Sequence, residues 1–149
     1  MIEKSNLAAK PVICCGSILD SMAELERPDR RECEDVAIAV TDGVDGLLLS
    51  DNAANGKYGL DALNTIGRCC AEAERTIDYK GVLTDMRNMT PKTLINDDGL
   101  ASSAMSVVLD KDLELIVVVT KTGTLPRLLS KYRPSVPILS FSNDEVILR

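Results

Sequence analysis

The sequence predicts an α/β fold with parallel strands, because buried-strand patterns and helical patterns alternate along the chain. A mostly apolar run at 11–19 follows a Lys-Pro start, and a shorter apolar run follows at 46–50. Between them, residues 30–42 place apolar side chains at helical spacing. The second half alternates helix and strand again, as in other α/β proteins. The chain has 149 residues, enough to bury a sizeable core.

The first strand–helix step covers residues 11–42. The run at 11–19 is typical of a strand buried on both faces, and 20–29 is a polar connection. Helix 30–42 has one apolar face, and Gly43 is a residue of the kind that ends helices. The members of that face are Cys33, Val36, Ala37 and Val40.

The segment Arg27-Pro28-Asp29-Arg30 leads into this helix. Asp29 is a predicted N-cap, and Glu32 lies three residues later as its capping-box partner. The segment therefore has an ordinary structural explanation as a helix entrance.

The second step starts with a short buried strand at 46–50 and continues through a loop at 51–59. A helix is predicted at 60–77, with an inner face made of Leu63, Ile66, Cys70 and Ala73.

Residues 78–98 break the rhythm with Gly, Asn, Thr, Pro and Met, which indicates a junction between two domains. We therefore expect one domain at 1–80, a linker at 81–98 and a second domain at 99–149. The second domain is predicted to contain two helices and two strands. In chain order these are a helix at 99–109, a strand at 113–120, a helix at 124–132 and a strand at 136–142.

Composition excludes several classes of protein. The net charge is −6 with dispersed basic residues, which argues against a nucleic-acid partner. No apolar run approaches the ~18 residues of a membrane span, and the polar N-terminus does not resemble a secretory signal. We expect a soluble, cytoplasmic protein. The chain has no His, which removes Ser–His–Asp and Cys–His catalysis.

The five cysteines do not have the spacing of a metal site. They lie at Cys14, Cys15, Cys33, Cys69 and Cys70. Without histidine ligands a zinc site is not expected, so we interpret them as buried thiols in a reducing compartment. Carboxylates at the ends of helices and strands are interpreted as solvated charges. These are Asp42, Asp45 and Asp51.

A hydroxyl-rich turn follows the strand at 113–120. It consists of Thr120, Lys121, Thr122, Gly123 and Thr124. A strand, a glycine-containing turn and a helix N-terminus favour an anion, because free backbone N–H groups, the helix dipole and a lysine all attract phosphate. Threonines are also ordinary N-caps, so a purely structural role is the alternative.

The order of these motifs resembles pyruvate kinase. The segments KPVI, SM, RPDR, DVAIAVTDG and LLLS are similar to the last two β/α units of its catalytic barrel. TKTGT and PRLLSKYRPSVPILS are similar to the start of its regulatory C-terminal domain. The resemblance implies part of a (β/α)8 TIM barrel, then part of an α/β domain with a parallel sheet. It also implies that 120–124 corresponds to a sugar-phosphate effector loop. For 27–30 it implies a place near a subunit interface, so a contact with a partner protein is the alternative to a helix entrance.

The resemblance fails at the loops where barrel enzymes carry their chemistry. Where the family has Ala-Thr-Gln, this chain has Cys15, Gly16 and Ser17. Gly16 lacks the hydroxyl of the threonine that it replaces. Ser17 either substitutes in part for the glutamine or serves its own turn.

In the second loop the family has Ser-Gly-Glu-Thr. Ser50 is retained, but Asp51, Asn52 and Ala53 follow it. The glutamate charge and the threonine hydroxyl are lost. On the preceding helix, Ile38 stands where the family has an asparagine, so we expect a core side chain there. We therefore predict no catalytic residue in this chain.

The resemblance implies phosphoryl transfer from phosphoenolpyruvate to ADP with Mg²⁺ and K⁺, but the family's ligands for both ions have no counterpart here. We expect a truncated pyruvate kinase chain that is inactive alone. The alternative is a degenerate, non-catalytic paralogue that binds phosphorylated small molecules or partner proteins, or that has no retained role. Two β/α units leave sheet edges uncovered, so we expect a homo-oligomer or pairing with another pyruvate kinase chain.

Overall fold

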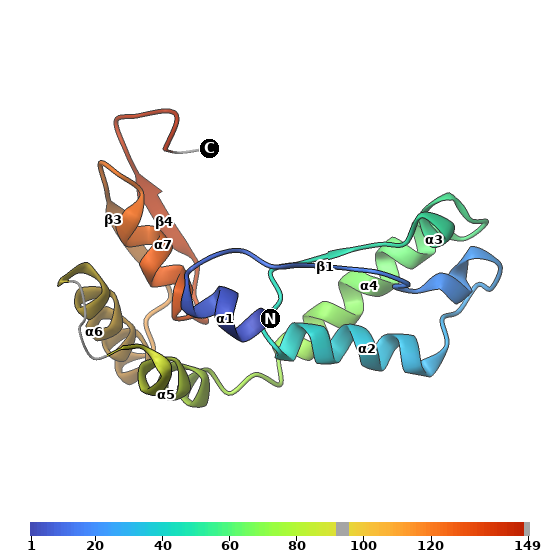
Figure 1. Ribbon diagram of the computed structural model, residues 1–149, viewed down its shortest axis with the longest axis horizontal. Coiled ribbons are helices and arrows are strands. Elements are labelled where there is room, and N and C mark those ends of the chain that lie inside the picture. Colours follow the sequence, from blue (N-terminus) through green and yellow to red (C-terminus); the bar gives the residue numbers. More distant parts are fainter. Residues whose placement is uncertain (92–95, 148–149) are drawn as a thin grey trace. The chain divides into compact units, whose positions relative to one another are not determined.

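A computed structural model describes residues 1–91 and 96–147 of the chain (Figure 1). The chain divides into two compact units. Unit 1 consists of Met1–Asn6 and Pro11–Ile77, and unit 2 of Leu7–Lys10 and Asp78–Arg149. Each unit contains a two-stranded parallel sheet with helices, which confirms the predicted α/β class.

Unit 1 is built around strands β1 and β2. Its elements in chain order are α1 (Ile2–Leu7, whose last residue counts with unit 2), β1 (Ile13–Cys15), the 3-10 helix η1 (Asp20–Ala23), α2 (Arg30–Thr41), β2 (Gly46–Leu48), α3 (Asp51–Asn55) and α4 (Gly59–Glu74). The strands pair in parallel, with Ile13 opposite Gly46 and Cys15 opposite Leu48. In Figure 1, α2 runs below this pair and α4 rises toward α3.

Strand β1 is much shorter than the predicted strand at 11–19. It ends at Cys15 because the next residues leave the extended conformation. Gly16 has φ 153°, and the N–H of Ile18 donates to the Gly16 carbonyl at 2.9 Å. Leu19 then adopts a left-handed conformation with φ 55°. The apolar side chains of 18–19 therefore enter the core from a turn rather than from a strand.

Helix α2 begins and ends close to its predicted limits. Asp29 is the N-cap in an extended conformation, and its N–H donates to Glu32 Oε2 at 3.1 Å, as in the predicted capping box. The segment predicted as a loop at 51–59 instead contains helix α3. Ser50 caps it, because its Oγ accepts a hydrogen bond from the N–H of Ala53 at 3.1 Å.

The core of unit 1 lies between η1, α2 and α4. Its buried residues are Leu19, Met22, Val36, Ala62 and Ile66. Two predictions of inward side chains are wrong. Leu63 is 59% exposed, because Ala62 and Ile66 take the inner face of α4, and Ile38 is 57% exposed on α2. The cysteines are also less buried than predicted: Cys15 is exposed and the other four are half-buried.

Unit 2 is built around strands β3 and β4. Its elements are α5 (Tyr79–Met89), α6 (Asn96–Lys111), β3 (Ile116–Val119), α7 (Thr124–Lys131) and β4 (Ile138–Phe141). The strands pair in parallel, with Ile116 opposite Ile138 and Val119 opposite Phe141, and α7 lies against them (Figure 1). The core residues are Leu83, Met86, Ala101, Met105, Val118, Leu129 and Tyr132.

Helix α5 lies in the region that the sequence assigned to a junction. Its residues Leu83 and Met86 are buried in the core of unit 2, so this part of the expected linker 81–98 is a packed helix. Residues 92–95 of that linker are outside the described part of the chain. Single-residue breakers such as Gly81 suggested a loop, but the apolar residues at helical spacing decided the structure.

Each sheet has one face on which apolar side chains are exposed, called its bare face below. On β3 and β4 the exposed side chains are Val117 (58%), Val119 (82%), Leu139 (46%) and Phe141 (52%). On β1 and β2 they are Ile13 (68%) and Leu48 (60%). Parallel sheets are normally covered on both faces, so each bare face is unusual. Among the described helices, none combines the length and the apolar character that a membrane crossing needs.

Candidate functional site

The first candidate site lies at the carboxyl ends of β1 and β2. Because these strands are parallel and in register, the loops that follow them leave the same edge of the sheet. Gly16 and Ser17 are exposed there. On the second loop, which forms α3, Asn52 is also exposed, whereas Ala53 is fully buried.

Few of the predicted site residues at this edge have a polar side chain that is available to a ligand. The Ser50 hydroxyl accepts a hydrogen bond from Ala53 and so serves as the cap of α3. Gly16 has no side chain, and Ala53 has no polar atom. Ser17 and Asn52 are therefore the exposed polar side chains among the four residues that the sequence singled out, Gly16, Ser17, Ser50 and Asn52.

A cavity of 290 Å³ lies between β1 and α2. It brings Gly16 and Ser17 together with the carboxylates of Glu32 and Asp35, but it does not include Ser50 or Asn52. Asp35 was not predicted from the sequence, and Glu32 was predicted only as a capping residue. Their i, i+3 spacing on α2 was the available signal, since such residues share one side of a helix.

The Glu32 carboxylate is occupied by structural hydrogen bonds. Its Oε1 accepts from the backbone N–H of Ser21 at 2.9 Å, and its Oε2 accepts from the N–H of Asp29 at 3.1 Å. The Ser21 hydroxyl donates to the same Oε2. Glu32 thus ties η1 and the connection 24–29 to the first turn of α2, which leaves it little capacity as a general base.

The second candidate site is the turn 120–124 in unit 2. The Thr120 hydroxyl accepts from the backbone N–H groups of Gly123 at 3.0 Å and of Thr122 at 3.4 Å. The hydroxyls of Thr122 and Thr124 lie 3.0 Å apart. The turn therefore satisfies with its own hydroxyls the donors that an anion would use.

Gly123 is the N-cap of α7 and has a left-handed conformation with φ 71°. A Cβ atom at this position would also meet the Ile147 side chain at 3.2 Å. The backbone conformation therefore favours glycine, and a larger residue would also force the Ile147 side chain to shift.

A cavity of 590 Å³ adjoins this turn at the carboxyl ends of β3 and β4. Thr120 and Lys121 line one part of it, while Asp144 and Glu145 line another. Thr122, Gly123 and Thr124 are not among its lining residues. The lysine favours an anion here, and the two carboxylates oppose a highly charged one.

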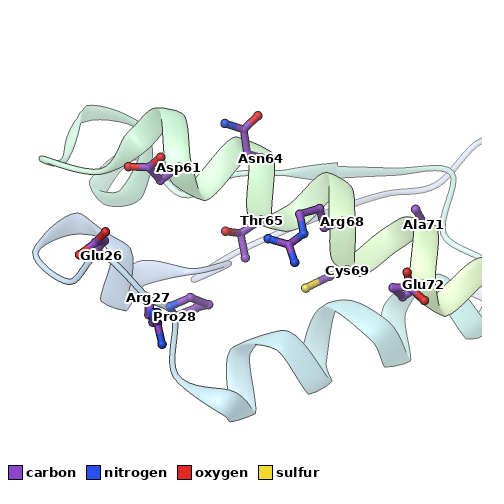
Figure 2. Close-up of a pocket in the computed structure, with 10 residues that line it drawn as sticks. All are labelled: Glu26, Arg27, Pro28, Asp61, Asn64, Thr65, Arg68, Cys69, Ala71 and Glu72. Atoms are coloured by element: carbon purple, nitrogen blue, oxygen red, sulfur yellow. The ribbon is translucent and has the colours of Figure 1, made fainter.

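A third cavity is an open groove of 960 Å³ in unit 1. Figure 2 shows the connection before α2 on one side and α4 on the other. Glu26, Arg27 and Pro28 line it from the connection, and Arg68 and Cys69 are among the residues from α4. The sequence had indicated a partner contact as one alternative for 27–30, but it had not indicated the α4 side.

Comparison with known proteins covers both units. Residues 1–63 match the family model "Pyruvate kinase, barrel domain", and residues 98–149 match "Pyruvate kinase, alpha/beta domain". A pyruvate kinase of Naumovozyma castellii is 42% identical over 139 residues, and pyruvate kinase 1 of Saccharomyces cerevisiae is 43% identical. A crystal structure of a Cryptosporidium parvum pyruvate kinase matches 98% of the chain with a TM-score of 0.90 at 40% identity.

The chain belongs to the pyruvate kinase family. It spans 28% of the length of the two yeast relatives and 30% of the Cryptosporidium structure. A second structure of the Cryptosporidium pyruvate kinase, with a TM-score of 0.85, is a complex with ADP.

Pyruvate kinases generally use Mg²⁺ and K⁺, so the carboxylates and thiols of the described residues are the candidate ligands. They contain no group of three His, Cys, Asp or Glu side chains placed to hold a metal ion. One buried carboxylate oxygen in the described part of the chain, Asp20 Oδ1, lacks a hydrogen-bond partner. A single oxygen does not provide the several oxygen ligands that Mg²⁺ needs, so these residues do not fit the ion.

Proposed function

We propose that this chain carries the last two β/α units of a pyruvate kinase barrel and the start of its C-terminal domain. We also propose that the 149-residue chain alone does not transfer phosphoryl from phosphoenolpyruvate to ADP. The observation that carries this is the edge of β1 and β2, where Gly16 and Ala53 offer no polar side-chain atom. Phosphoryl transfer depends on positioned cations and charge stabilisation, and the described residues have no metal cluster.

A coupled assay of pyruvate formation tests this proposal. The purified chain is incubated with phosphoenolpyruvate, ADP, Mg²⁺ and K⁺, and pyruvate kinase 1 of Saccharomyces cerevisiae serves as the positive control. We expect a signal no greater than that without protein. Pyruvate formation that scales with the concentration of the chain would overturn the proposal.

A second candidate function is binding of a phosphorylated small molecule at 120–124. Lys121 is exposed at the turn, and α7 begins at Thr124, so a positive charge and a helix N-terminus converge there. The hydroxyl of Thr120 would have to release the N–H groups of Thr122 and Gly123 to the phosphate. The chain would then act as a non-catalytic, phosphometabolite-binding paralogue.

Calorimetric titration with a sugar bisphosphate tests this second function. Lys121→Ala should weaken binding by about tenfold, a typical effect of one charge-assisted contact. Lys111→Ala removes an exposed lysine of the same unit outside the turn and should leave affinity unchanged. Equal affinity of the Lys121→Ala protein and the parent would mean that the turn is only a helix cap.

We further propose that the bare face of β3 and β4 pairs with a second copy of this chain. Four exposed apolar side chains on adjacent strands support an interface of this kind. A longer pyruvate kinase chain is the alternative partner. Sedimentation should show a dimer that Val119→Asp converts to a monomer, whereas Leu60→Asp on α4 should leave it intact.

The proposed setting is glycolysis in the cytoplasm. The family is glycolytic, and the described residues include no membrane-spanning helix. Cell fractionation with an antibody to the chain tests the location, and recovery in an organelle fraction would contradict it.

A further inference from the structure

Asn55 is followed directly by Gly56 at the end of α3, and this is the one Asn-Gly pair in the sequence. Asparagine is a chemically labile residue. Its side-chain amide is lost most readily before glycine, because a neighbour without a side chain lets the next backbone nitrogen approach the amide carbon. Every other asparagine of the chain precedes a residue that has a side chain. These asparagines are Asn6, Asn52, Asn64, Asn88, Asn96 and Asn143.

Two hydrogen bonds keep the reacting groups of this pair engaged elsewhere in the folded chain. Asn55 Nδ2 donates to the carbonyl of Asp51 at 3.0 Å, so the side-chain amide turns back along α3. The N–H of Gly56 donates to the carbonyl of Ala53 at 3.3 Å, which is longer than is typical for such a bond. Both groups must be released before the Gly56 nitrogen can reach the Asn55 amide carbon.

Their release requires only that the last residues of α3 open. The helix has five residues, little more than one turn, and Asn55 is the last of them and is exposed. Helices this short have little stability of their own, and their ends open far more often than the protein core. The start of α3 is held more firmly, because Ser50 Oγ accepts a hydrogen bond from the N–H of the fully buried Ala53.

We propose that Asn55 is a site of spontaneous deamidation, and that opening of the end of α3 controls the rate. The Gly56 nitrogen loses its proton and attacks Cγ of Asn55, a C–N bond forms, and the side-chain nitrogen leaves as ammonia. Water then opens the resulting cyclic imide at either of its carbonyls. One product has aspartate at position 55. The other has isoaspartate, in which the main chain runs through the former side chain. Overall, one water is consumed and one ammonia is released, and the reaction does not depend on any activity of the chain.

Isoaspartate at this position would separate α3 from η1. Gly56 lies so close to η1 that a Cβ on it would be 2.4 Å from the Cα of Ala23, and the N–H of Lys57 donates to the Ala23 carbonyl at 2.9 Å. Isoaspartate adds a carbon to the main chain immediately before Gly56, which displaces both contacts. The new carboxylate also lies at the C-terminal end of α3, where the helix dipole disfavours a negative charge. Because α3 follows β2 and carries Asn52, the modification would alter the edge of the sheet in unit 1.

Mass spectrometry of the folded full-length chain tests the proposal. The protein is aged at neutral pH and digested with trypsin, which gives a peptide of residues 32–57 that contains both Asn52 and Asn55. We expect the mass gain of deamidation at Asn55 before any other asparagine. Asn52 is exposed on the same helix and should stay unchanged over the same time, so it is an internal control. Asn55→Gln should abolish the mass gain.

Two N-cap variants test whether opening of α3 controls the rate. Ser50→Ala removes the cap of α3 and should speed deamidation of Asn55 by up to about fivefold, the effect that loss of a cap has on an opening equilibrium. Asp78→Ala removes the matched cap of α5, whose carboxylate accepts from the N–H of Lys80 at 3.1 Å, and should leave the rate unchanged. The parent unfolded in urea should react faster than either variant in buffer.

The products provide a further measurement. The isoaspartate form, separated by chromatography, should unfold at a lower urea concentration than the Asn55→Asp protein, because only isoaspartate lengthens the main chain. Equal stability of the two would overturn the proposed separation of α3 from η1.

Helical circular dichroism shows that each variant is folded before rates are compared, and the comparison of buffer with urea needs no variant at all. Three results would overturn the proposal. They are equal rates in the folded and unfolded parent, equal rates for Ser50→Ala and the parent, and an intact Asn55 in the folded chain after the unfolded chain has reacted completely.

Discussion

Lys131 Nζ lies 3.2 Å from both carboxylate oxygens of Asp98, and the side chains are only 6% and 10% exposed. The hydroxyl of Tyr132 donates to Asp98 Oδ1 at 3.0 Å. Burial raises the pKa of Tyr132, and the hydrogen bond to Asp98 raises it further. This buried cluster joins the first turn of α6 to the end of α7, the helix that begins at the turn 120–124.

Breaking this ion pair should strongly destabilise unit 2. Lys131→Met leaves the Asp98 charge buried without its cation, which typically costs about 3–5 kcal/mol. Urea unfolding followed by circular dichroism measures the loss. Arg30→Ala, which breaks the exposed pair with Glu34, should cost less than about 1 kcal/mol.

A double variant distinguishes the loss of the ion pair from the cost of leaving one charge buried without a partner. Asp98→Leu combined with Lys131→Met removes both charges and should recover most of the loss, because no unpaired charge remains. A Lys131→Met protein as stable as the parent would show that water reaches Asp98.

Replacing either of two glycines in unit 1 by alanine should change stability, but in opposite directions. A Cβ at Gly67, inside α4, meets nothing within 4 Å, so Gly67→Ala should stabilise by about 0.5–1 kcal/mol through helix propensity. A Cβ at Gly56 would lie 2.4 Å from the Cα of Ala23, so Gly56→Ala should destabilise. Thermal unfolding of both variants checks the order, and a stabilising Gly56→Ala would contradict the packing of α3 against η1.

The stability of unit 1 should fall in alkaline solution. Burial, the Cys69 side chain and the charges of Glu32 and Asp29 raise the pKa of Cys33 from 9.0 to about 11. The folded state then holds the proton more tightly than the unfolded chain. The contribution of the protonated Cys33 thiol to the free energy of unfolding is complete below pH 9 and is lost as the pH rises through about 11.

Unfolding free energies measured between these pH values check this dependence. Cys33→Ser should decline less steeply than the parent over that range, and Cys15→Ser, at an exposed thiol, should decline like the parent. If the unfolding free energies of Cys33→Ser and the parent fell equally with pH, the result would contradict this prediction.

Removing the Glu32 carboxylate should loosen the entrance to α2. Glu32→Ala leaves the N–H groups of Ser21 and Asp29 without their acceptor and should cost about 1–3 kcal/mol. Urea unfolding gives the value. Glu34→Ala, two residues along the same helix and exposed, is the control and should change stability by less than about 0.5 kcal/mol.

Elements whose signals all lie within one segment were predicted more accurately than elements that depend on contacts with the rest of the chain. Helix α2 was predicted closely because its cap, its capping box and its apolar spacing all lie within one segment. The strand at 11–19 was overestimated, since hydrophobicity alone does not distinguish an extended residue from Leu19 in a left-handed turn. Helices α3 and α5 were missed, because α3 is short and α5 contains a glycine that suggested a loop.

At the candidate sites, too, the sequence predicted local features but not which distant side chains come together. The resemblance to a β/α barrel predicted that the loops at 16–17 and 50–53 lie where such enzymes carry their chemistry. Which side chains share a cavity could not be derived in that way. The grouping of Ser17 with Glu32 and Asp35 depends on the packing of α2 against β1.

By itself the sequence determined the α/β class, the limits of α2 and the resemblance to pyruvate kinase, because these depend on residue type and spacing along the chain. It also determined which polar groups are missing at Gly16 and Ala53. Only the tertiary structure decided that Ser17 and Glu32, 15 positions apart in the sequence, line the same cavity. The burial of Asp98 with Lys131 was likewise decided by packing, since contacts between distant residues leave no periodic signal in the chain.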